Sequence, residues 1–195
     1  VSSDYTAYFA GDNAGIGSYS AEYLGKQLNG SGTIAVLNVP SSGSVSTERV
    51  NAFKDVMSEK YPDINLIDMT APDFTQQSGL KTLSDVLVAN NKIDAIFSID
   101  DESSIGMLQA IKDANRTDVK YLTGAGGSQN YFEKISKSEQ PICITATYSP
   151  SMIKDAVQAA VDIKDGKKVE KDNIIPPTIV TKDNVSSLLD PNSPY

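Results

Sequence analysis

Polar and aromatic side chains follow the short apolar segments of this chain, and they are the residue types that could do chemistry. Arg49 lies one turn inside a helix-like segment, Asp100 follows an apolar run, and Asn13 opens another helix-like segment. Arginine, carboxylate and amide groups bind neighbouring hydroxyl groups through paired hydrogen bonds. Aromatic rings such as those of Phe74 and Tyr148 can cover the C–H face of a sugar. This set of side chains favours recognition of a polyol.

The composition excludes several other kinds of chemistry. The 195 residues include no histidine and a single cysteine, Cys143. Imidazole-activated nucleophiles, histidine-ligated zinc or copper sites and an internal disulfide are therefore excluded. The net charge of −8 gives no basic surface for nucleic acid. Any chemistry must therefore come from carboxylates, amides, hydroxyls, tyrosines, lysines and the two arginines, Arg49 and Arg116, and we expect no nucleic-acid partner.

Each candidate residue also has an ordinary structural explanation. Arg49 is either an exposed helical arginine or a bidentate contact to a ligand. Acidic residues at a helix start favour the helix dipole and supply an N-cap, which would account for Asp101, whereas Asp100 at the strand tip could accept sugar hydroxyls. Residues such as Phe74 and Tyr148, taken alone, are more often core residues than surfaces for a ligand. A metal site or an acid–base pair would need further carboxylates on facing loops.

The elements that must position these residues alternate regularly along the chain. Helix-period segments separate short apolar runs, several of which are continuous and so indicate strands buried on both faces. The sequence predicts an α/β fold: an open, mostly parallel sheet flanked by helices on both faces, with ligands bound beyond the carboxyl ends of the strands. The predicted helices begin near residues 14, 46, 73, 101, 128 and 150, and the predicted strands are 5–10, 33–39, 64–69, 93–99, 119–123, 142–147 and 178–180.

The order of the loops resembles that of ribose-type periplasmic sugar-binding proteins, the type I solute-binding proteins of ATP-driven importers. The resemblance runs from about residue 10 to the end and covers only the second part of such a protein, which implies a lobe of the periplasmic-binding-protein-like I fold. It rests on Gly-Asp-Asn at 11–13, Ser-x-x-x-Glu-Arg-x-x-x-Phe at 44–53, Pro-Asp-Phe at 72–74, Ile-Asp-Asp-Glu-x-x-x-Gly at 99–106, a glycine corner at 124–127 and Tyr-x-Pro at 148–150.

The resemblance implies roles for particular residues. Arg49 matches an arginine that clamps sugar oxygens, Asp100 a position that contacts hydroxyl groups, and Phe74 an aromatic that lines the pocket. Asn13 lies just after the first crossover between lobes, and Tyr148 lies where the chain crosses back. The expected ligand-binding residues are Asn13, Arg49, Phe74, Asp100, Gly126 and Tyr148.

Two departures from the ribose pattern concern the ligand. Ribose binders commonly have Gly-Phe-Asp-Gly at the glycine corner, so Gly126 stands where a carboxylate is common. Tyr148 stands where glutamine is usual. These differences point to a different monosaccharide, a polyol or a sugar-like signal molecule as much as to ribose.

The resemblance also implies how the chain is divided and what it meets. Residues 1–148 and 177–195 are expected to form the C-terminal sugar-binding lobe, and 149–176 a return segment that packs on the N-terminal lobe in relatives. Without that lobe, the apolar stripe of the helix at 150–165 is expected to pack on another chain, as in a homodimer, or on this domain. The implied partners are a small sugar or polyol, the missing N-terminal lobe and the membrane permease of an ABC importer.

The leading hypothesis is thus non-enzymatic solute binding for import, with no catalytic residue, metal or cofactor, in the periplasm or at the extracellular face of the membrane. Residues 1–5 do not look like a secretory signal, so export, free or as a lipoprotein, would depend on sequence outside this chain. The alternative is the effector-sensing domain of a lactose-repressor-family regulator, which a basic helix-turn-helix before residue 1 would favour. A small α/β enzyme is a third hypothesis, disfavoured by the missing nucleotide fingerprints and the absence of histidine.

Overall fold

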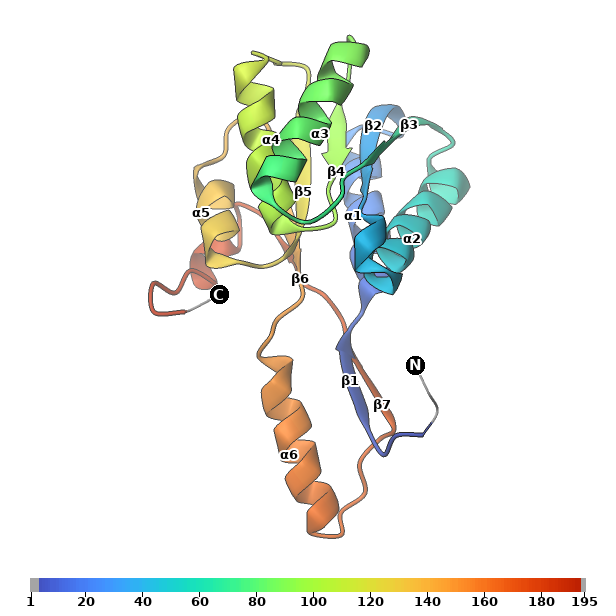
Figure 1. Ribbon diagram of the computed structural model, residues 1–195, viewed down its shortest axis with the longest axis vertical. Helices are drawn as coiled ribbons and strands as arrows, with labels where there is room; N and C mark the ends of the chain where they lie inside the picture. The colour runs from blue at the N-terminus through green and yellow to red at the C-terminus, as the bar shows by residue number, and fades with distance from the viewer. Residues whose placement is uncertain (1–3, 194–195) are drawn as a thin grey trace.

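A computed structural model describes residues 4–193 and consists of a larger and a smaller part (Figure 1). The larger part surrounds a six-stranded sheet of order β3-β2-β4-β5-β6-β8, in which β8 runs antiparallel to β6 and the other pairs are parallel. The smaller part contains the parallel pair β1–β7 and helix α6. The elements are β1 Tyr8–Gly11, α1 Asn13–Gln27, β2 Ser31–Asn38, α2 Ser44–Lys60, β3 Asp63–Thr70, α3 Gln76–Ala89, β4 Ala95–Phe97, α4 Asp101–Asp113, β5 Tyr121–Gly126, α5 Gln129–Lys137, β6 Ile142–Thr147, α6 Met152–Lys164, β7 Asp172–Ile175 and β8 Ile179–Val180.

Helices cover both faces of the large sheet, which confirms the predicted α/β class. Helices α1 and α2 pack together on one face, and α3 and α4 pack together on the other (Figure 1). Side-chain caps fix where several of these helices begin: Asp12 accepts from the backbone N–H of Gly15, and Asp100 accepts from that of Ser103. The third helix begins at residue 76 rather than near 73, because Thr75 supplies its cap.

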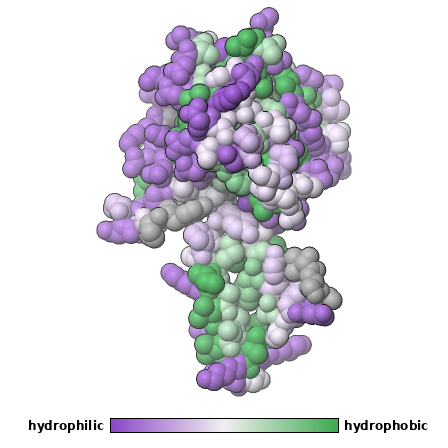
Figure 2. Space-filling model, in the orientation of Figure 1, coloured by the Kyte–Doolittle hydropathy of each residue, from purple (hydrophilic) through white to green (hydrophobic). Residues whose placement is uncertain are grey.

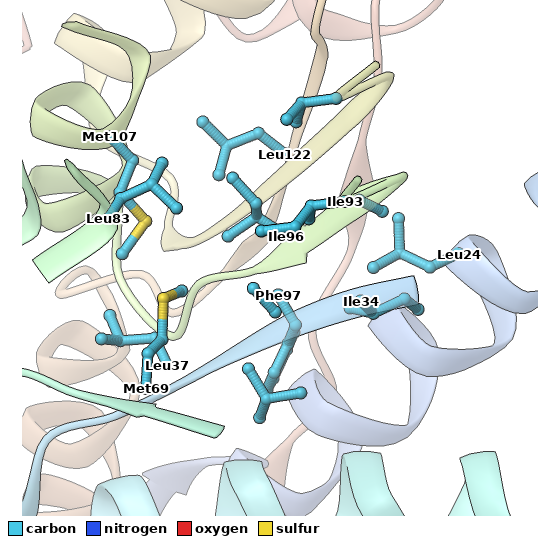
Figure 3. Packing of buried hydrophobic residues seen from close by; sticks show 14 of the residues in the cluster. Leu24, Ile34, Leu37, Met69, Leu83, Ile93, Ile96, Phe97, Met107 and Leu122 are labelled. Atoms are coloured by element: carbon cyan, nitrogen blue, oxygen red, sulfur yellow. The ribbon is translucent and has the colours of Figure 1, made fainter. Parts of the chain in front are cut away.

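The core lies between the sheet and its two helical layers. Figure 3 shows Leu24 of α1 beside Ile34 of β2, with Leu83 of α3 and Met107 of α4 on the other face of the sheet. Residues 34–37 of β2 are all fully buried, which explains why this strand is a continuous apolar run. The parallel, doubly covered sheet follows directly from that pattern.

The first strand was predicted in the large sheet, and this prediction was wrong. Strand β1 pairs instead with β7, which lies in the stretch 165–177 that showed no strand signal. Strand β7 has the sequence Asp-Asn-Ile-Ile and is half to fully exposed, so it lacks the apolar run that marks the buried strands. The smaller part therefore begins with β1.

The chain passes between the two parts at three places that lie side by side. The N–H of Asp12 donates to the carbonyl of Ile175 (2.9 Å), and that of Thr147 donates to the carbonyl of Thr178 (3.0 Å). These bonds join the ends of β1, β6 and β7 at the junction of the two parts. Within residues 4–193, no helix is both long and apolar enough to cross a membrane.

Candidate functional site

Five of the six expected ligand residues follow five adjacent strands of the large sheet. Phe74 follows β3, Arg49 lies in α2 after β2, Asp100 follows β4, Gly126 ends β5 and Tyr148 follows β6. Because these strands are parallel, their carboxyl ends lie at one edge of the sheet. The chain continues from β2 to β3 on one side of the sheet and from β4 to β5 on the other side. The gap between β2 and β4 is therefore the topological switch point, where open α/β sheets bind ligands. Arg49 and Asp100 flank this gap.

Arg49 is a buried residue that ties several elements together, not an exposed helical arginine. The whole residue is only 6% exposed. Its Nε donates to Oδ1 of Asn13 (2.9 Å), and its Nη1 donates to the carbonyl of Ile99 (2.6 Å). Its guanidinium carbon lies 5.4 Å from the centre of the Tyr148 ring, within cation–π range. The guanidinium group is thereby oriented at the switch point.

Tyr148 joins this cluster to the junction of the two parts. Its N–H donates to the carbonyl of Gly126 (2.8 Å). A Cβ added to Gly11 would lie 2.4 Å from two carbons of the Tyr148 ring, so the ring packs on the bare backbone of β1. Glycine is required at position 11 because of this close approach. The Arg49 cluster, defined as Asn13, Arg49, Asp100 and Tyr148, therefore reaches from α1 to the start of α6.

Asp100 is the only member of the cluster with a buried polar atom that lacks a partner in residues 4–193. Its Oδ1 accepts from the N–H of Ser103 (2.7 Å) and caps α4, while its Oδ2 is buried without a hydrogen bond. Burial raises the pKa of this carboxyl to about 6, against the lowering effects of Ser103 and of the Arg49 charge. A buried acceptor without a partner is costly, so a hydroxyl donor at this oxygen would be favourable.

Asp101 has a structural role that the sequence did not reveal. Asp100, not Asp101, is the cap of α4. Asp101 lies in the first turn of that helix, as expected of an acidic residue that favours the helix dipole, and it is also buried. Its Oδ2 accepts from the N–H groups of Gly127 and Ser128, both at 2.8 Å, and its Oδ1 accepts from the hydroxyl of Thr145 at 2.6 Å. It therefore braces the glycine corner against α4 and β6. Nothing in the linear sequence links residue 101 to residues 127 and 145.

Phe74 is not brought into the cluster. It is half-buried and packs against the main core, and no hydrogen bond or ring contact joins it to the other five residues within the described part of the chain. Its role as an aromatic lining stays a prediction. Residues 4–193 contain no group of three or more His, Cys, Asp or Glu that could hold a metal ion. Burial raises the pKa of the Cys143 thiol to about 12, as suits a small core residue.

The chain is similar to binding proteins for sugars and polyols. It is 28% identical over 163 residues to the ribose import binding protein RbsB of Bacillus subtilis, and 25% identical over 175 residues to the xylitol-binding protein of Mycolicibacterium smegmatis. These matches cover 83% and 89% of this chain. They cover 51% and 49% of the relatives, so the chain spans about half the length of the curated relatives it matches.

Solved structures show the same fold. The fructose-binding periplasmic domain of a hybrid two-component system superimposes with a TM-score of 0.86 at 28% identity, over 97% of this chain and 63% of that one. A solute-binding protein of Bacillus halodurans with bound myo-inositol gives a TM-score of 0.82 at 22% identity, over 94% of this chain and 63% of that one. Residues 1–168 match the family model described as periplasmic binding protein domain. The chain therefore belongs to the periplasmic binding protein domain family.

Proposed function

We propose that this chain is the sugar-facing lobe of a solute-binding protein that delivers a monosaccharide or small polyol to an ABC importer. The observation that carries the proposal is the Arg49 cluster at the switch point of the sheet. It presents an oriented guanidinium group next to a buried carboxylate oxygen that lacks a partner. Relatives named for ribose, xylitol and fructose support a ligand of this class.

The chemistry of the cluster suits a neutral polyhydroxylated ligand held without covalent change. Arg49 can donate to ligand oxygens, and Oδ2 of Asp100 can accept from a ligand hydroxyl. The ring of Tyr148 offers an apolar surface next to Arg49. We include Gly126, which ends β5 at the same edge of the sheet. We include Phe74 as a lining residue on the side of β3.

The smaller part supports the proposal that a further lobe covers it in the whole protein. Apolar side chains gather over α6 in Figure 2, and Ile153, Val157 and Ile174 are 62%, 58% and 50% exposed. We propose that residues 149–176, together with β1, belong to a second lobe whose remainder lies outside this sequence. The two lobes would close on the ligand about the three crossings. Alternatively, α6 of a second copy of this chain covers the same face.

The remaining parts of the proposal concern the cellular context. A permease of an ABC importer is the proposed membrane partner, and the proposed location is the periplasm or the extracellular face of the membrane, free or lipid-anchored. The relatives described above favour transport over the effector domain of a repressor. They also favour binding over catalysis.

Calorimetric titration of this chain with D-ribose, D-fructose and xylitol tests the proposal. We expect weak binding, because a single lobe supplies only part of the contacts of a closed site. Arg49→Ala and Asp100→Ala should each abolish it, whereas Lys112→Ala, at the exposed end of α4, should leave it unchanged. Tight binding that neither Arg49→Ala nor Asp100→Ala alters would contradict the proposal.

A further inference from the structure

A cavity of about 620 Å³ is lined by residues of α5, of the C-terminal tail and of the first turn of α6. Its volume falls within the range of about 300–1,000 Å³ that is typical of small-molecule sites. Phe132 of α5 and Leu188 of the tail give it an apolar wall, the glycine corner at 126–127 supplies backbone, and Lys154 of α6 faces it. Apart from Gly126, none of its lining residues is expected to contact the sugar.

The outer wall of the cavity is held in place by one side chain. Nε2 of Gln129 donates to the carbonyl of Leu188 (3.0 Å), and Oε1 of Gln129 accepts from the N–H of Asp190 (2.9 Å). The amide therefore fastens the tail to the start of α5. The cavity is preformed, and a ligand would not have to order this wall on binding.

The charge of the cavity is opposite to that of the chain. The chain carries a net charge of −8, yet no Asp or Glu is among the residues in 4–193 that line this cavity, and Lys154 is the one charged residue there. The amine of Lys154 forms no hydrogen bond or ion pair with any residue that the structure describes, whereas Lys167 is held by Asp162 (2.7 Å). The hydroxyl of Thr178 adds a neutral donor and acceptor. This local positive charge favours an anion.

We propose that this cavity is a second binding site, for a small hydroxylated organic anion such as a sugar acid. Lys154 pairs with the carboxylate of the ligand, the hydroxyl of Thr178 meets its hydroxyl groups, and Phe132 and Leu188 pack on its carbon chain. The walls come from the larger part and from α6, so the bound anion bridges the two parts next to the crossings. This site is separate from the Arg49 cluster and does not depend on the proposed sugar binding.

Gluconate and sorbitol make a matched pair of probes, because they differ by a carboxylate in place of a hydroxymethyl group. We expect gluconate, at constant ionic strength, to raise the melting temperature of the full chain and to bind in calorimetry, and sorbitol at equal concentration to do neither. Lys154→Gln should weaken gluconate binding at least about tenfold, because the variant cannot pair a positive charge with the carboxylate of the ligand. Lys164→Gln, on the same helix but away from the cavity, should bind gluconate like the parent chain.

Two further variants locate the bound anion. Ser151→Trp should fill the cavity and abolish gluconate binding, with unchanged circular dichroism as the check on folding. Arg49→Gln should retain gluconate binding. The proposal is overturned if gluconate fails to bind, if sorbitol binds equally well, if gluconate binding is undiminished in Lys154→Gln, or if it is lost in Arg49→Gln.

Discussion

At the scale of single residues, the site depends on buried charges that are held by a few specific contacts. Arg49 is fixed by Asn13 and by the carbonyl of Ile99. One carboxylate oxygen of Asp100 caps α4, and the other has no hydrogen-bond partner among residues 4–193. Such an arrangement is costly in the absence of a ligand, because the second oxygen has lost its water. A ligand hydroxyl that donates to this oxygen would relieve the unfavourable burial and so contribute to binding.

The substitution Asp100→Asn tests this cost through its pH dependence. Burial raises the pKa of Asp100 from 3.8 to about 6, so the folded state binds the proton more tightly than the unfolded state. This contribution to stability is fully present below about pH 4 and is lost as the pH rises through 6. Since Asn keeps the cap, Asp100→Asn should raise the free energy of unfolding at pH 8 by about 1–3 kcal/mol and make no difference at low pH. Urea unfolding at both pH values measures this, and a loss of stability at pH 8 would argue against a strained carboxylate.

At the scale of elements, Asp101 links the start of α4 to the glycine corner after β5 and to β6. Its three accepted hydrogen bonds lie inside the protein, where an unmade bond is costly. Asp101→Ala should lower the free energy of unfolding by about 2–4 kcal/mol, as followed by thermal or urea denaturation. Glu102→Ala, at the exposed neighbouring position, should change it by less than about 0.5 kcal/mol. Similar losses in the two variants would show that Asp101 is not a brace.

The sequence predicted those elements that carry a strong local signal. The run Ile142–Thr147 matches β6 residue for residue, because its isoleucine and threonine side chains are β-branched and favour a strand. Strand β7 was not predicted because it is short and largely exposed. It is defined by its pairing with β1, which lies 161 or more residues away in the chain. The position of Arg49 and Asp100 at one edge followed from the expectation that the loops after parallel strands lie together beyond the carboxyl ends of the sheet. The stacking of Tyr148 on Arg49 and on Gly11 did not, since it depends on three-dimensional packing alone.

At the scale of the whole molecule, the smaller part is an α/β unit that is not covered on its apolar face. Val157→Lys should reduce the fluorescence of the hydrophobic dye ANS bound to the chain, because Val157 is 58% exposed on the centre of α6. The free energy of unfolding should change by less than about 0.5 kcal/mol. Gln158→Lys, which adds the same charge off the apolar stripe, should leave the dye signal as it is. Equal dye signals in the parent and Val157→Lys would show that this face does not offer an apolar surface.

The central claim is that the carboxyl edge of the large sheet is half of a sugar site, and nuclear magnetic resonance tests it most directly. Titration of the labelled chain with D-ribose, D-fructose and xylitol should shift the backbone amide signals near residues 13, 49, 100, 126 and 148, and Arg49→Ala should remove these shifts. Shifts that cluster elsewhere, or that persist unchanged in Arg49→Ala, would contradict the claim.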